Sequence, residues 1–107
     1  MRPNKILSLI GLAMKSGNVV SGEFMTEKAV KSGQAFLVII SSEASDNTRK
    51  KFSNMCEFYQ VPCSSYGKSE DLGHSMGKEF RVSLAITDKG FADSIRKQLK
   101  DNLEVIE

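Results

Sequence analysis

The sequence predicts an α/β protein with a sheet sandwiched between helices, in a three-layer α-β-α arrangement. The main observation is that segments with apolar residues at helical spacing alternate with short runs of branched apolar residues along the whole chain. The second is length: 107 residues suffice for one hydrophobic core and are too few for two, so we expect one domain over residues 1–107. Right-handed crossovers would place helices on both faces of the sheet.

Five helices and four strands are expected to alternate. In chain order they are a helix that begins at Lys5, after Pro3 and Asn4, and is stopped by Gly17; a strand at Val19-Val20; a helix over 23–32; a strand at Phe36–Ile40; a helix from residue 45 or 46 to Tyr59; a strand at Val61–Tyr66; a helix over 70–76; a strand at Val82–Thr87; and a helix that begins at Asp88. Residues 99–107 form a tail that could dock or fray.

Apolar stripes, caps and breakers justify these elements. The stripes are Ile6, Leu9, Ile10 and Ala13; Met25, Ala29 and Val30; Phe52, Met55, Cys56 and Tyr59; and Ala92, Ile95 and Leu99. Ser45 and Ser69 can cap the helices that follow them, and Gly33 can end a helix in the left-handed conformation. Phe36 to Ile40 is an unbroken apolar run, as in a buried strand, whereas Pro62 favours an edge strand.

Composition excludes several classes of protein. The chain is 40% hydrophobic and 26% charged, as in a globular domain, and its longest apolar run is far too short to cross a bilayer. The first residues lack a secretory cleavage pattern, so we expect a cytoplasmic protein with no membrane partner. Two cysteines, Cys56 and Cys63, are not spaced like a metal hairpin. Reduced thiols are favoured, and a disulfide is the alternative.

The sequence lacks the motifs of the common enzymes. It contains no phosphate-binding Gly-x-x-x-x-Gly-Lys-Ser/Thr and no dinucleotide-binding Gly-x-Gly-x-x-Gly after a strand. The single histidine, His74, has no acidic or cysteine partner at a spacing typical of a triad or metal site. We therefore expect a protein that is not an enzyme and that needs no cofactor or metal.

The turn at Gly22 is the first candidate binding element. Ser21 and Gly22 open a helix whose first amides are free, and free amides at a helix start favour a phosphate or carboxylate. Lys28 and Lys31 lie one turn apart and could add positive charge to the same rim. An ordinary amphipathic helix with solvated lysines would explain the same residues.

The loop Lys78–Ser83 is the second candidate. It contains Phe80 and Arg81, and it leads into a strand that we expect to neighbour the strand before Gly22. Basic side chains and backbone amides bind phosphates, while an apolar loop residue can pack on an unstacked base, so the two loops together predict an RNA-binding surface. The alternative for Phe80 is a core residue under the loop.

The sequence resembles the L-seven-Ae and L-thirty-e superfamily of ribosomal and kink-turn RNA-binding proteins over about residues 3 to 98, most closely its bacterial YlxQ-like branch. The motifs that carry the resemblance are Leu-Ile-Gly-Leu-Ala (9–13), Ser-Gly-Glu (21–23), Asn-Thr-Arg-Lys-Lys (47–51), Leu-Gly-His (72–74) and Ala-Ile-Thr-Asp-Lys-Gly-Phe (85–91). The resemblance implies a mixed four-stranded sheet between helices and the binding of a kink-turn, an RNA helix bent sharply at a bulge beside tandem sheared G·A pairs.

Carried over by position, Gly22 matches the glycine of close approach and Lys28 the lysine that contacts phosphate or guanine. Phe24 and Met25 occupy the positions of an Asn-Glu pair that reads guanines in the family, and neither side chain can make those polar contacts. Residues 78–83 match the loop that cups the bulged nucleotide, although Glu79 and Arg81 make it more polar than usual.

Two functions are consistent with these residues. The first is a non-catalytic, monomeric RNA-binding protein, associated with the ribosome or translation, whose target is a structured RNA such as ribosomal RNA or an mRNA element. The second is a protein-interaction module that uses Phe24 and Met25 as an apolar patch. The expected RNA-binding residues are Gly22, Glu23, Phe24, Met25, Lys28, Lys31, Lys78, Glu79, Phe80, Arg81, Val82 and Ser83.

Overall fold

A computed structural model describes residues 4–106, with side chains for residues 4–100. Pro3, which the sequence places before the first helix, lies outside the described residues. The elements are α1 (Lys5–Lys15), β1 (Val19–Ser21), α2 (Glu23–Lys31), β2 (Leu37–Ile40), α3 (Asp46–Tyr59), β3 (Cys63–Ser65), α4 (Ser69–Ser75), β4 (Ser83–Ile86) and α5 (Lys89–Ile106). Their order is the one that the alternating periodicity predicts.

The four strands form one mixed sheet in the order β1-β4-β2-β3. β2 and β3 are parallel, whereas β4 runs antiparallel to both of its neighbours. The expectation that β1 and β4 are neighbours is therefore confirmed, and β3 lies at an edge, as Pro62 predicts. Because of these directions, the ends of β1 and β2 meet the beginning of β4, where Ser83 pairs with Ile40 and Leu84 with Ser21.

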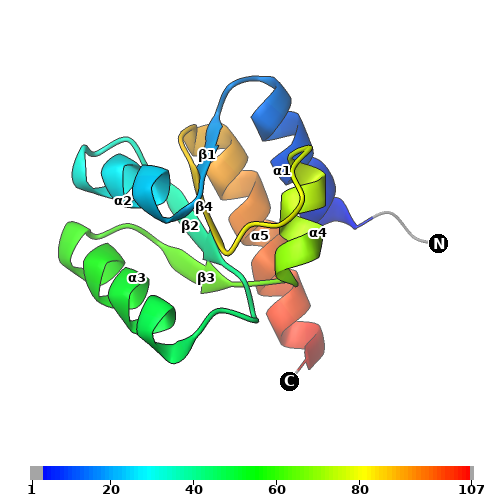
Figure 1. The fold of residues 1–107 in the computed structure, drawn as a ribbon. Coiled ribbons are helices and arrows are strands. Elements are labelled where there is room, and N and C mark those ends of the chain that lie inside the picture. The colour runs from blue at the N-terminus through cyan, green and yellow to red at the C-terminus, as the bar shows by residue number, and fades with distance from the viewer. Residues whose placement is uncertain (1–3, 107) are drawn as a thin grey trace.

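Helices cover both faces of the sheet, which confirms the three-layer prediction (Figure 1). Alternate residues of β2 point to opposite faces: Leu37 and Ile39 pack with α1, α4 and α5, whereas Val38 and Ile40 pack with α2 and α3. All four are buried, as the unbroken apolar run predicts for a strand covered on both sides. The sheet is thus fully enclosed except at its ends and edges.

Of the predicted helix caps, Ser45 is confirmed and Ser69 is wrong, and Asp88, predicted to begin the last helix, caps it instead. Ser45 Oγ accepts a hydrogen bond from the N–H of Thr48 at 3.2 Å, and Asp88 Oδ2 accepts one from Phe91 at 2.9 Å. Ser69, in contrast, is the first residue of α4 instead of its cap. Its N–H donates to Glu43 Oε1 at 2.8 Å, so a carboxylate from the loop after β2 satisfies this helix start.

Three apolar side chains that were predicted to be buried are exposed. Met25, Phe36 and Tyr59 each have 41% of their surface accessible. In α2 the inward face consists of Thr26, Ala29 and Val30, and Met25 lies beside it. The strand begins after Phe36, and Tyr59 is the last residue of α3, beyond the positions that pack on the sheet.

The last helix is longer than its apolar stripe suggests. Its backbone continues to Ile106, so most of the segment left open as a tail is helical. The sequence leaves open whether the apolar residues of this segment dock on the protein. These residues are Leu103, Val105 and Ile106, and their side chains lie outside the described residues. Among the helices that the structure describes, none combines the length and apolar character needed to cross a bilayer.

Candidate nucleic-acid interface

The two loops predicted to bind RNA meet in one hollow of about 290 Å³ at the end of the sheet. We call it the α2–β4 hollow. It is lined by Gly22, Glu23, Thr48, Phe80, Arg81, Val82 and Ser83. Every lining residue except Thr48 is among the expected binding residues. The expected residues Phe24, Met25, Lys28, Lys31, Lys78 and Glu79 lie on the same segments but do not line the hollow.

Backbone hydrogen bonds hold the two loops together. The N–H of Gly22 donates to the carbonyl of Ser83 at 2.9 Å, and on the other side of β4 the N–H of Ser41 donates to the carbonyl of Val82 at 2.8 Å. The segment that enters β4 is therefore fastened to the ends of both β1 and β2. This explains why residues distant in the sequence line the same hollow.

Glycine is required at the start of α2 by the backbone conformation. Gly22 caps this helix at φ +90° and ψ 159°, a region that glycine reaches readily and that strains other residues. It supplies no side chain to cap the first turn, which leaves the opening amides of α2 available to an anion, as the sequence predicts. Glu23 is the first residue of the helix and brings a carboxylate to the same place.

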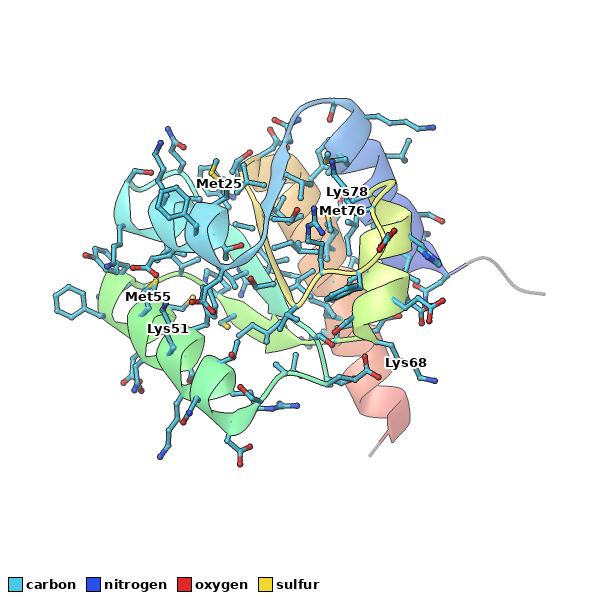
Figure 2. All side chains as sticks on the ribbon, in the orientation of Figure 1. Met25, Lys51, Met55, Lys68, Met76 and Lys78 are labelled. Atoms are coloured by element: carbon cyan, nitrogen blue, oxygen red, sulfur yellow. The ribbon has the colours of Figure 1, made fainter. Side chains whose placement is uncertain are left out.

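Lysine side chains neutralise the acidic groups beside this helix start. Lys51 Nζ lies 3.1 Å from Glu23 Oε2 and 2.9 Å from Glu27 Oε1, and Lys31 Nζ lies 2.8 Å from Glu27 Oε2. Hydrogen bonds from Lys31 and then Lys51 lower the pKa of Glu27 to about 2. The same contacts raise the pKa of both lysines. Lys51 therefore joins α3 to α2, and in Figure 2 it lies on the side of α3 that faces α2.

Lys28 differs from Lys31 in its surroundings. Lys31 is engaged with Glu27, whereas Lys28 is exposed and makes no ion pair within residues 4–100. Of the two lysines predicted to add charge to the rim, Lys28 is thus the one whose ammonium group is free for a phosphate. Lys78 is also exposed, and Figure 2 places it at the end of α4, away from α2 and α3.

The loop before β4 is fastened to α4. The N–H of Lys78 donates to the carbonyl of Gly73, and the N–H of Arg81 donates to the carbonyl of Ser69, both at 2.9 Å. Gly73 lies directly under this loop, where a Cβ atom would come within 2.6 Å of the Phe80 nitrogen. The position of the loop therefore depends on the absence of a side chain at residue 73.

Phe80 and Arg81 occupy different environments at the hollow. Phe80 is 58% exposed, so the alternative that it is a core residue under the loop is wrong. Arg81 is half-buried: its Nε donates to Ser21 Oγ at 3.0 Å, and its Nη1 donates to the carbonyl of Phe80 at 2.8 Å. The guanidinium group thus bridges the end of β1 and the loop, and it supports the backbone next to the exposed ring.

A buried polar contact forms the floor of the hollow. Ser83 and Thr26 are both fully buried, and the Ser83 hydroxyl donates to Thr26 Oγ1 at 3.4 Å. The Ser83 side chain therefore couples β4 to α2 and is not available to a ligand. Its presence among the expected binding residues reflects its place in the chain next to Val82, which is partly accessible.

Sequence reasoning missed the contribution of α3. Thr48 lines the hollow and Lys51 neutralises the acidic groups at its edge, and both lie in the first half of that helix. They belong to the segment 47–51 that carried part of the family resemblance, but nothing in their own spacing indicates a binding site. Only the packing of α3 against α2 brings them to it.

His74 lies apart from the α2–β4 hollow. His74 is exposed, at a groove between α1 and α4. Within the part of the chain that the structure describes, no three His, Cys, Asp or Glu side chains gather as they would to hold a metal ion. Six of the twelve expected binding residues line the α2–β4 hollow instead.

The fold and this hollow define a class of protein: a small α-β-α sandwich with a hollow where a mixed sheet ends. The chain belongs to the Ribosomal protein L7Ae/L30e/S12e/Gadd45 family, whose model matches residues 4–96. The resemblance inferred from the sequence motifs is therefore confirmed, together with the fold that it implies.

Named relatives and a solved structure agree with this assignment. RNA-binding protein YlxQ of Bacillus subtilis (strain 168) is 42% identical over 87 residues, which cover 81% of this chain and 87% of the relative. Large ribosomal subunit protein eL30 of Trypanosoma brucei brucei is 35% identical, with 78% and 82% covered. A Bacillus halodurans protein of unknown function is 38% identical with a TM-score of 0.89, covering 92% of this chain and 99% of that one. The first two of these names describe an RNA-binding and a ribosomal protein, in agreement with the expectation that the chain is not an enzyme.

Proposed function

We propose that the chain is a non-catalytic RNA-binding protein that recognises a kink-turn-like bulge in a structured RNA. The observation that carries this proposal is the α2–β4 hollow, in which the opening of α2 and the loop 78–83 face the same space. One side supplies backbone amides and the other an exposed aromatic ring. Amides suit a phosphate and a ring suits an unstacked base, so the combination fits a nucleotide that has left the helix stack.

Each part of such a nucleotide has a counterpart in the hollow. A phosphate would lie at the first turn of α2, where the helix dipole favours negative charge, and Lys28, in the last turn of the same helix, would contact the RNA backbone further along. The base would pack on Phe80, with Thr48 offering a hydroxyl for a polar contact. Lys51 offsets the charge of Glu23, which would otherwise repel the backbone of the RNA. The hollow is too small for a duplex, so the bulge is the part that enters it.

The exposed residues at positions 24 and 25 shape the specificity of the proposed site. Phe24 has 75% of its surface accessible and Met25 also points outward, where the family resemblance places an Asn-Glu pair. These side chains cannot read the hydrogen-bonding edges of guanines. Recognition would therefore rest on the bulged nucleotide and the bent backbone more than on the sheared G·A pairs.

The names of the relatives support a role in translation. One relative is named an RNA-binding protein and another a protein of the large ribosomal subunit. We therefore extend the proposal to a target in ribosomal RNA or in an mRNA element, bound by a monomer in the cytoplasm. The whole chain, residues 1–107, would act as one binding domain.

A fluorescence titration tests the proposal. A labelled kink-turn RNA and a duplex of equal length are titrated at about 50 and 200 mM salt, where six to ten phosphate contacts would weaken binding by about 10³ to 10⁵. We expect tighter binding to the kink-turn and a steep loss with salt. Equal affinity for both RNAs would contradict recognition of the bulge, and no binding to either would contradict RNA binding altogether.

The second candidate function is that of a protein-interaction module. It is favoured by the exposure of Phe24 and Met25 on adjacent positions of α2, since exposed apolar side chains that lie together often mark a contact with another protein. An apolar contact responds little to ionic strength, whereas RNA binding falls steeply. The salt series therefore separates the two candidates.

A further inference from the structure

A pair of thiols joins α3 to the edge strand on a different part of the molecule. Cys56 lies on α3 and is only 2% exposed, whereas Cys63 is the first residue of β3 and is partly accessible. Both thiols are free, and Cys63 packs against the apolar cluster that contains Cys56. The chain turns back between them through a hydrogen bond from the N–H of Val61 to the carbonyl of Cys56 at 2.8 Å.

Cys63 opens onto its own hollow of about 280 Å³, lined by Ile40, Arg49, Ser53, Cys63, Ser64 and Ser65. None of these residues lines the α2–β4 hollow. The Arg49 guanidinium is held in place by the carbonyl of Ser42 at 2.7 Å and by Ser65 Oγ at 3.4 Å. A small polar molecule that enters this hollow would therefore meet a wall formed by Cys63 and by a guanidinium group held in place.

These surroundings make the two thiols unequal. An S–H donor stabilises a thiolate, and the hydrogen bond from Cys56 lowers the pKa of Cys63, although burial acts in the opposite direction. The same hydrogen bond, followed by burial, raises the pKa of Cys56. Cys63 is thus the more accessible of the two thiols and the one whose pKa is lowered, while Cys56 is buried in the cluster against which Cys63 packs.

We propose that Cys63 is a peroxide-reactive thiol and that Cys56 resolves its oxidised form as an intrachain disulfide. The Cys63 thiolate attacks one oxygen of hydrogen peroxide, the O–O bond breaks, and a sulfenic acid and hydroxide form. The Cys56 sulfur then attacks the Cys63 sulfur, an S–S bond forms, the S–O bond breaks, and the hydroxyl group leaves as water after taking the Cys56 proton. In sum, two thiols and one peroxide give one disulfide and two waters.

The position of the pair gives this chemistry a structural consequence. β3 is an edge strand, paired with β2 through Cys63 and Val38, and α3 carries Thr48 and Lys51 at the α2–β4 hollow. A disulfide between Cys56 and Cys63 would tie the end of α3 covalently to the sheet. The proposal itself concerns the thiol pair and holds whether or not the chain binds RNA.

Intact-mass spectrometry after mild peroxide treatment tests the proposal on the full-length folded protein. We expect the wild-type chain to lose two hydrogens and peptide mapping to join Cys56 to Cys63. In Cys56→Ser, dimedone should trap one sulfenic acid per chain, at Cys63. In Cys63→Ser, the remaining thiol should stay unmodified until the protein is unfolded. Serine differs little in size, and circular dichroism verifies that both variants are folded.

Three results would overturn the proposal. The first is that Cys63 reacts with peroxide no faster in the folded chain than in the unfolded chain. The same protein unfolded in urea is the internal control. Another is a sulfenic acid on Cys63 of the wild-type chain without an intrachain disulfide, which would remove the role of Cys56. The third is preferential labelling of Cys56 in the folded wild-type protein, which needs no variant to be detected.

Discussion

The backbone of Phe80 occupies the space that a side chain on Gly73 would need. A Cβ atom at residue 73 would lie 2.6 Å from the Phe80 nitrogen and 2.8 Å from the carbonyl carbon of Glu79. Backbone atoms cannot move aside as the tip of a flexible side chain can, so helix α4 and the loop are fitted to each other at this point. The exposed ring of Phe80 is held over the hollow because residue 73 is a glycine.

Gly73→Ala should therefore damage both stability and binding. Forcing a methyl group into this contact should lower the free energy of unfolding by about 1 to 3 kcal/mol, as overpacking does elsewhere, and shift Phe80 away from the hollow. Urea unfolding and RNA titration measure the two effects. Gly90→Ala, at the start of α5 and the opposite end of the sheet, is the control and should leave RNA affinity unchanged. A Gly73→Ala protein with wild-type stability and affinity would contradict this account.

Lys28→Ala should weaken RNA binding alike for all sequences that carry the bulge. The loss of one phosphate contact reduces the slope of log affinity against log salt by roughly 1. Lys97→Ala is the matched control, because Lys97 is also an exposed helical lysine without an ion pair in residues 4–100 but lies on α5, across the sheet. Equal salt slopes for the two variants would remove Lys28 from the interface.

Phe80→Ala should reduce the preference for a bulged RNA over a duplex. Stacking of one base on an aromatic side chain contributes about 1 to 3 kcal/mol, so the kink-turn should lose most of that energy and the duplex little. Stability should change by less than about 0.5 kcal/mol, since the ring is largely exposed. Phe58→Ala removes an even more exposed ring from the end of α3 and should preserve the preference. Parallel titrations with both RNAs provide the measurement.

Lys51→Ala should raise the pKa of Glu27 from about 2 toward its ordinary value of 4.5, because one of its two lysine partners is lost. A carboxyl pKa that is lowered by folding stabilises the protein above pH 4.5, and that contribution disappears as the pH falls from 4.5 through about 2. An NMR titration of the Glu27 carboxyl carbon follows it directly.

RNA affinity should also fall in Lys51→Ala, since the Glu23 carboxylate beside the hollow is no longer offset. Lys50→Ala removes a neighbouring exposed lysine that makes no ion pair in the described part of the chain. It should change neither the pKa of Glu27 nor RNA affinity. An effect of equal size in both variants would show that general charge, and not the contact with Glu23, is responsible.

The sequence predicts the order of elements well because each is specified locally. Ser45 and Asp88 cap the helices that follow them, and the run from Leu37 to Ile40 is buried throughout. Local patterns do not say what lies opposite a side chain. Met25 and Tyr59 have helical spacing with buried neighbours, yet 41% of the surface of each remains accessible.

The part of the candidate site that depends on strand direction could be predicted from the sequence. A turn after β1 and a loop before β4 must meet if those strands are antiparallel neighbours, and Gly22 and Ser83 do meet. Thr48 could not be found in this way, because its place depends on how α3 packs beside α2. The contact of Gly73 with Phe80 depends on how closely two backbone segments approach each other. A glycine in a short helix does not by itself predict such a close approach.

The entry to β4 is held from both sides, by Gly22 through Ser83 and by Ser41 through Val82. A binding loop that must be ordered when its ligand arrives loses conformational entropy on binding. Here the loop continues directly into a central strand, so its shape is set by the folding of the protein itself. The protein would therefore meet its RNA as a preformed template, and most of the conformational change on binding would fall on the nucleic acid.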